Sequence, residues 1–210
     1  LLGVITVDDV LDVMQDEADS DYSGLAAVDV RETHDTPLSA ARSRLPWLVT
    51  LLFLGMGTAT LISQYDALIA EASVLSAFVT LITGTAGNAG TQSLAVAVRK
   101  LTNKYDDDNF FSSIMFELIT GAITGLIVGI TVMLIVLVWK QNLVLGAVIG
   151  IAMMAAIIVA NLAGSFIPKI MDRLGFDPAV ASGPFISTLS DLTSVFIYFS
   201  IAQLFLSAII

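Results

Sequence analysis

Apolar stretches of membrane-spanning length constrain this chain more than any other feature. A helix of about 20 apolar residues crosses the roughly 30 Å hydrocarbon core of a bilayer, and runs of this order recur along the sequence. A soluble domain rarely has such runs, and 56% of the residues are hydrophobic. We therefore predict an all-α, polytopic membrane protein with five transmembrane helices per subunit, at about residues 45–62, 72–98, 110–138, 143–167 and 184–210.

The Lys and Arg residues predict the orientation of these helices. Eight of the nine lie before the first run, after the second or after the fourth, and Lys140 alone lies on the other side. Cytoplasmic loops carry the excess of basic residues in membrane proteins. We therefore expect a multi-pass protein of the plasma (cell inner) membrane, with a cytoplasmic N-terminus and an external C-terminus.

The first 44 residues precede these spans and are much more acidic. Within residues 1–16 we expect a short strand at 2–7 and then a helix that Asp8 or Asp9 opens. Because this pair cannot bury a core alone, and because the chain starts with Leu, we interpret it as the end of a preceding domain. Residues 17–44 are predicted to form an acidic cytoplasmic linker or connecting helix, and residues 45–210 the membrane domain. The linker acids are either solvated or bind divalent cations, for which the candidate ligands are Asp16, Glu17, Asp19 and Asp21.

The last apolar run carries an aspartate, Asp191, inside its first third. An isolated carboxylate within a membrane span costs on the order of 3 kcal/mol on insertion scales, so it should face a protein interior or a wet cavity. At helical spacing, Ser187, Ser194 and Tyr198 share its face. Asp191 is therefore either a packing residue that a neighbouring hydroxyl satisfies or part of an ion site, and this polar track favours the ion site.

Glycines and polar residues interrupt the second run. Its middle, G-T-A-G-N-A-G-T-Q-S, places Gly84, Gly87 and Gly90 beside Asn88 and Thr91. Glycines this dense are expected to thin or break a helix and to let its carbonyl groups face a cavity. Close helix packing would explain the glycines equally well. It would not explain the Asn, the Gln and the hydroxyls among them, so packing alone does not account for this run.

The third run contains a face of small residues and one acid. Gly121, Gly125 and Gly129 recur every fourth residue, a spacing typical of close helix packing, which is one reason to expect a dimer. Glu117 lies one or two turns inside the run, near its cytoplasmic end. We expect Glu117 to reach the interface or to pair with a cation, and we rank it below Asp191 as a candidate site residue.

A single deep carboxylate is a poor match for a divalent cation. A two-fold homodimer would bring two copies of Asp191 to one axis. Mg²⁺ gives up its water reluctantly and is typically held by one or two carboxylates with several waters retained, whereas Ca²⁺ takes more direct oxygen ligands. The sequence therefore predicts a homodimeric pore for a largely hydrated Mg²⁺.

Three motifs resemble one known family. They are G-N-A-G-T-Q-S at residues 87–93, D-P-A-V-A-S-G-P-F-I-S-T-L-S-D at 177–191, and G-V-I-T-V-D-D-V-L-D-V at 3–13, the last of which resembles the end of a CBS domain. Together they resemble the MgtE magnesium channel family. This resemblance implies a homodimeric Mg²⁺ channel whose second and fifth spans line the pore. It also implies Mg²⁺ as both the transported and the regulatory ion, with cytoplasmic CBS domains that close the pore when cytosolic Mg²⁺ is high.

The resemblance also assigns roles to individual residues. It makes Asp191 the selectivity carboxylate, with Asn88 and the nearby glycine backbone assisting, and Asp177 an acidic partner at the cytoplasmic mouth. Thr83 stands where many relatives have proline, so the resemblance does not decide whether the second span is broken there. The residues predicted to line the pore are Gly87, Asn88, Gly90, Thr91, Ser187, Thr188 and Ser194. The implied partners are a second copy of the chain, membrane lipids and its own N-terminal regulatory domains, with no nucleic acid.

Other classes of protein fit the sequence less well. An ion-coupled secondary transporter of Mg²⁺, Mn²⁺ or Co²⁺ would also use a deep acid, but no second half of the chain repeats the first. An intramembrane aspartyl protease needs two catalytic aspartates, and Asp191 alone lies deep enough, so we do not expect an enzyme. A purely structural anchor would not need polar residues on two spans.

Overall fold

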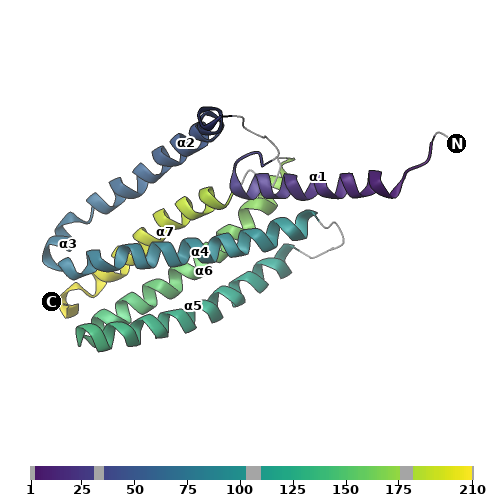
Figure 1. Cartoon of the computed structure of the whole chain (residues 1–210). Coiled ribbons are helices and arrows are strands. Elements are labelled where there is room, and N and C mark those ends of the chain that lie inside the picture. Colours follow the sequence, from purple (N-terminus) through teal and green to yellow (C-terminus); the bar gives the residue numbers. More distant parts are fainter. Residues whose placement is uncertain (1–2, 31–35, 103–109, 176–181, 210) are drawn as a thin grey trace.

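The computed structural model describes residues 3–30, 36–102, 110–175 and 182–209, and these are almost entirely helical (Figure 1). No strand occurs in these four segments, which confirms the all-α prediction. The elements in chain order are α1 (Val7–Ala26), α2 (Pro37–Ser63), α3 (Asp66–Glu71), the 3₁₀ turn η1 (Ser73–Leu75), α4 (Ser76–Thr102), α5 (Phe110–Lys140), α6 (Leu143–Arg173), α7 (Gly183–Leu204) and α8 (Leu206–Ile209).

Four helices of the described segments are long and apolar enough to cross a membrane: α2, α5, α6 and α7. Helix α5 agrees closely with its predicted run, whereas α2 begins at Pro37 rather than at about 45, α6 ends at Arg173 rather than 167, and α7 ends at Leu204 rather than 210. Helix α4 has 27 residues, enough to span a bilayer, but its glycines and polar residues make it less apolar than the other four. The membrane crossing of α4, and hence the count of five spans, therefore stays a prediction.

Helix α6 is the centre of the bundle. It packs against α4, α5 and α7, and α4 also packs against α7 (Figure 1). The main core joins large side chains of these helices, among them Ile82 of α4, Met153 of α6 and Phe199 of α7, all of which are fully buried. Helix α5 packs mainly on α6, so the seam between α4 and α7 lies away from α5.

The small-residue face of α5 packs against α6 within the same chain. A methyl group at Gly125 would lie 2.9 Å from the carbonyl oxygen of Met154, and one at Gly129 would lie 2.6 Å from that of Gly150. Both distances are below van der Waals contact, so these glycines let the two backbones touch. The face is thus occupied inside one chain, and it does not support the dimer for which the sequence analysis used it.

Helix α4 runs without interruption through its glycines, so the predicted thinning or break in this span is wrong. The glycines instead allow close packing on two sides. A methyl at Gly87 would lie 2.8 Å from Ser187 Oγ, and one at Gly90 would lie 3.0 Å from Ser190 Oγ and 3.2 Å from the Ala160 carbonyl oxygen. The backbone of α4 keeps its helical hydrogen bonds, and the absent side chains admit α6 and α7.

The predicted N-terminal strand is also wrong for the part of 2–7 that the structure describes. Residues 3–6 have no regular structure, and Thr6 caps α1. The Thr6 N–H donates to Asp9 Oδ2 at 2.8 Å while Thr6 Oγ1 accepts from the Asp9 N–H at 3.3 Å, which is a capping box. A lone strand has no partner for its backbone groups, whereas this box satisfies two of them. The helix then continues to Ala26, well into the predicted linker.

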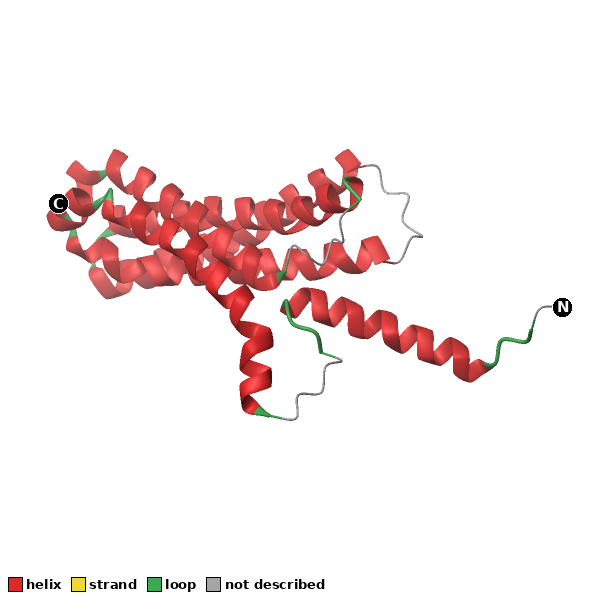
Figure 2. Cartoon of the chain, turned by 90° about the horizontal axis from the view of Figure 1, so that it is seen from above, coloured by secondary structure: helices red, strands yellow, loops and turns green. Residues whose placement is uncertain are grey.

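Helix α2 diverges from the rest of the bundle (Figure 2). None of its residues is buried, and its contact with α7 lies in its C-terminal half, where Gly57 faces Leu192. A cavity of about 630 Å³ separates α2 from α6 and α7. One chain therefore leaves the apolar surface of α2, including Leu52 and Phe53, open to lipid or to another protein surface.

Candidate cation site at the seam of helices α4 and α7

Asp191 lies eight residues after the start of α7, at the margin of the bundle. The carboxylate is partly buried, and no described residue donates a hydrogen bond to it. The neighbouring hydroxyls bond elsewhere, because Thr188 Oγ1 donates to the Pro184 carbonyl oxygen at 2.9 Å and Thr193 Oγ1 to that of Leu189 at 3.1 Å. In the described part of the chain, Asp191 therefore lacks the hydroxyl partner that the packing interpretation requires.

The polar face of α7 divides between the interior and the margin of the bundle. Ser194 and Tyr198 are fully buried, and the Tyr198 hydroxyl donates to the Leu75 carbonyl oxygen at 2.9 Å. Ser187 and Asp191 remain partly exposed. Ser194 is therefore buried inside the single chain, and its prediction as a pore-lining residue stays a prediction.

Helix α4 contributes the other side of the seam. Gly87 contacts Ser187, and the adjacent Asn88 is exposed beside this contact. Thr91 is partly exposed, with its hydroxyl bonded to the Asn88 carbonyl oxygen at 2.9 Å. Asp191 lies one turn beyond Ser187 on α7, so a carboxylate and a hydroxyl lie along this open seam. The Asn88 side chain borders the seam but lines a cavity toward α5 and α6. Of the predicted lining residues, Gly87 and Gly90 lie in helix contacts instead.

A second polar cavity, of about 440 Å³, lies on the other side of α4, between α5 and α6. Its polar lining residues come from all three helices: Thr85, Asn88, Gln92, Ser93, Glu117, Thr120, Thr124 and Asn161. Glu117 is 8% exposed, and Ser93 Oγ lies 2.7 Å from Glu117 Oε2. The described partner of Glu117 is the Ser93 hydroxyl, and the expectation that Glu117 reaches the interface or pairs with a cation stays a prediction.

The linker acids are spread along α1 rather than gathered. Asp16 and Glu17 are exposed, Asp19 is partly exposed, and Asp21 lines a cavity of about 470 Å³ with Arg99 of α4. Asp177 lies outside the described residues. Within the residues that the structure describes, no group of three or more acidic or His side chains could hold a metal ion. A regulatory site made by these acids therefore stays a prediction.

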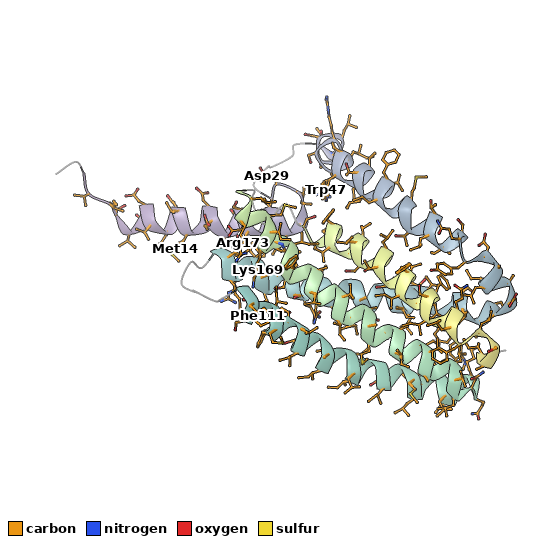
Figure 3. All side chains as sticks on the ribbon, turned by 180° about the vertical axis from the view of Figure 1, so that it is seen from behind. Met14, Asp29, Trp47, Phe111, Lys169 and Arg173 are labelled. Atoms are coloured by element: carbon orange, nitrogen blue, oxygen red, sulfur yellow. The ribbon has the colours of Figure 1, made fainter. Side chains whose placement is uncertain are left out.

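The C-terminal end of α1 nevertheless docks where α4 ends and α7 begins. Leu25 packs against the small cluster of Leu94, Val98 and Ile186, and a methyl at Gly183 would lie 3.2 Å from the Leu25 carbonyl oxygen. Figure 3 shows Lys169 and Arg173 of α6 at the same end of the bundle. Outside α2, the described basic residues other than Lys140 thus lie at the end of the bundle where α1 docks.

These helices define a multi-pass α-helical membrane protein with an acid at an open intrachain seam. Residues 79–201 match the family MgtE, described as a divalent cation transporter, and the chain belongs to this family. The resemblance seen in the sequence is thereby confirmed. The match includes the whole α4–α7 seam around Asn88 and Asp191.

The chain is also similar to three magnesium transporters named MgtE. It is 66% identical to that of Enterococcus faecalis over 207 residues, which cover 98% of this chain and 46% of the relative. It is 37% identical to that of Bacillus subtilis over 211 residues and 34% identical to that of Thermus thermophilus over 212, in each case across 100% of this chain and 47% of the relative. The chain thus spans about half the length of the curated relatives it matches.

Proposed function

We propose that this chain forms the membrane part of a Mg²⁺-selective channel for magnesium uptake, in which two copies of Asp191 face each other across a two-fold axis. The observation that carries the proposal is the Asp191 carboxylate, which lies on a membrane helix without a hydrogen bond from any described residue. Such a charge costs on the order of 3 kcal/mol in a membrane span, and a bound cation offsets this cost. Membership of a family of divalent cation transporters supports the same conclusion.

The chemistry of the seam favours a hydrated Mg²⁺ over a fully coordinated ion. Asp191, Ser187 and the Asn88 amide offer few direct ligands but several hydrogen-bonding groups for a water shell. Mg²⁺ keeps several waters when one or two carboxylates bind it, and a weak site of this kind also lets the ion leave. The alternative is an ion-coupled transporter of divalent cations, which single-channel recording separates from a channel because coupled carriers give no unitary currents.

The test is Mg²⁺ uptake into proteoliposomes by the Asp191→Asn variant, which preserves the shape of the side chain and removes its charge. We expect uptake to fall at least about tenfold, the factor that corresponds to 1.4 kcal/mol. The matched control is Asp66→Asn, the same change at an exposed acid on α3, which should leave uptake unchanged. Normal uptake by Asp191→Asn would place the site elsewhere. If mass analysis in detergent gave a monomer and that monomer conducted Mg²⁺, the proposal of two paired carboxylates would be refuted.

We further propose that cytosolic Mg²⁺ closes this channel through the acids of α1 and Asp177. Two like charges about 4 Å apart repel by roughly 4 kcal/mol at an effective dielectric constant near 20, before salt screening. A cation bound between them reverses this sign and draws α1 toward the ends of α4 and α7, where Leu25 already packs. Closure then follows from a higher affinity of Mg²⁺ for the closed state.

Patch recordings with titrated cytosolic Mg²⁺ test this regulation in the full-length protein, with the N-terminus on the cytoplasmic side. Neutralising Asp16, Glu17, Asp19, Asp21 and Asp177 together should move inhibition to higher Mg²⁺. Neutralising the exposed acids Asp66 and Glu71 near α3 should leave the curve in place. If the first set also leaves the inhibition curve unchanged, α1 is a solvated connector.

A further inference from the structure

Three oxygen atoms from three helices lie in a row beside the second polar cavity. Ser93 Oγ of α4 lies 2.7 Å from Glu117 Oε2 of α5 and 2.9 Å from the backbone carbonyl oxygen of Asn161 of α6. Ser93, Glu117 and Asn161 are 5%, 8% and 6% exposed. Both contacts are therefore short and buried, and they join the three helices at one point.

Counting hydrogens shows what this row requires. A serine hydroxyl carries one hydrogen, a carbonyl oxygen carries none, and an ionised carboxylate only accepts. With an ionised Glu117, the single Ser93 hydrogen would be shared between the two contacts, and at most one of them would be a well-aligned hydrogen bond. A proton on Glu117 Oε2 supplies the missing hydrogen, because the carboxyl then donates to Ser93 and Ser93 donates to the Asn161 carbonyl.

The surroundings of Glu117 agree with this count. The other polar residues that line the cavity are amides and hydroxyls, so none of the described lining residues brings a positive charge or a second titratable group. Lys100 lies two turns further along α4, with its Nζ 5.3 Å from the centroid of the Phe116 ring. An ionised carboxylate in a membrane span is costly unless a cation or a hydrated path compensates it.

We propose that Glu117 is a neutral carboxylic acid that donates a hydrogen bond to Ser93 and thereby fixes α5 to α4 and α6. On this assignment Glu117 binds no cation. It is a positioning residue, because the bonds at Ser93 fix the rotation of α4 and with it the position of Asn88, which lines the same cavity five residues earlier. The effect on uptake rests on the proposed function, whereas the proton on Glu117 does not.

The first test is infrared spectroscopy of the membrane-reconstituted protein at neutral pH. The spectrum of the wild-type protein minus that of Glu117→Gln should contain the carbonyl stretch of a protonated carboxylic acid, and labelling of glutamate with ¹³C should shift it. The matched control, Glu71→Gln at an exposed acid on α3, should give no such band. A difference spectrum for Glu117→Gln with only carboxylate bands would overturn the proposal.

The second test compares two substitutions of Glu117. Glutamine keeps the shape and can donate from its amide to Ser93, so Glu117→Gln should retain uptake and the unfolding temperature. Glu117→Ala removes the donor and should lower the unfolding temperature by about 2–8 °C. If Glu117→Gln loses uptake as Asp191→Asn does while still folding, Glu117 is a charged ligand and the proposal is wrong. Normal uptake by Asp191→Asn would refute the proposed function and leave the infrared assignment of Glu117 intact.

Discussion

A tight contact between two glycines of α4 and α6 provides a sharp test of the packing. Gly164 of α6 faces Gly90 of α4, and a methyl group at Gly164 would overlap the Gly90 carbonyl oxygen and lie 3.0 Å from Leu94 N. Carbon atoms pack best at about 3.5–4.0 Å, and the atoms in the way belong to the α4 backbone. Gly164→Ala therefore pushes two helices apart, since no side chain can rotate aside.

The magnitude follows from two opposing effects. Overpacking a well-packed core costs about 1–3 kcal/mol, and replacing glycine by alanine within a helix returns up to about 1 kcal/mol. Because backbone rather than side-chain atoms must move, we expect a net loss of about 1–2 kcal/mol. For a chain of this size, that loss lowers the unfolding temperature by about 2–8 °C. Both tryptophans, Trp47 and Trp139, can report unfolding by intrinsic fluorescence in detergent.

The control is Gly55→Ala on α2, where no atom lies within 4 Å of the new methyl. It should leave the unfolding temperature unchanged or raise it slightly, because only the helix propensity changes. If Gly164→Ala were as stable as Gly55→Ala, the α4–α6 contact would not be the tight junction described above, and the argument that the α4 glycines serve packing would fail with it.

Two further changes test single groups. Ser194→Ala removes a buried hydroxyl that has no hydrogen-bond partner among the described residues, so thermal unfolding should show equal stability or a gain of up to about 1–2 kcal/mol. Ser93→Ala removes a bonded hydroxyl and should destabilise the protein. A fall in stability for Ser194→Ala would show that its hydroxyl has a partner. Hydrogen bonds from the Thr6 hydroxyl and backbone N–H hold the pKa of Asp9 below its usual value. The capping box therefore contributes its full helix stability above the unfolded pKa of about 3.9, and this contribution is lost as pH falls through the lower folded pKa. Circular dichroism of a peptide covering residues 3–30 should show this loss of helix. The Asp9→Asn peptide should lack this contribution to the pH dependence.

The apolar runs predicted the helices well because a bilayer allows few alternatives. Each backbone group in the hydrocarbon core must bond within its own segment, so 20 or more apolar residues imply a helix. The bounds of α5 and the start of α7 followed from this alone, whereas α7 ends at Leu204, before the predicted end at 210. The strand predicted at 2–7 was wrong because backbone groups need hydrogen-bond partners there too. Thr6 and Asp9 bond to each other locally, and the sequence offers no second strand to pair with.

The candidate site was only partly predictable, because a glycine or a serine does not say which neighbour it faces. The pattern of α4 allowed both a pore and a packing interpretation, and the positions of Ser187 and Ser190 decide for packing at Gly87 and Gly90. Ser93 was part of the G-N-A-G-T-Q-S motif, and Asn161 is a polar residue within an apolar run, yet their meeting with Glu117 depends on the order of helices around α6. That order is a tertiary fact that no local pattern encodes.

The polar groups that a single chain leaves exposed argue for a second copy more strongly than the glycines of α5 did. Asp191 and Asn88 lie at a margin that a single bundle leaves open, and lipid cannot solvate a carboxylate. Burying this seam against a symmetric copy would remove both groups from lipid and place two carboxylates around water. The apolar surface of α2, with none of its residues buried, would remain for lipid or for the same partner.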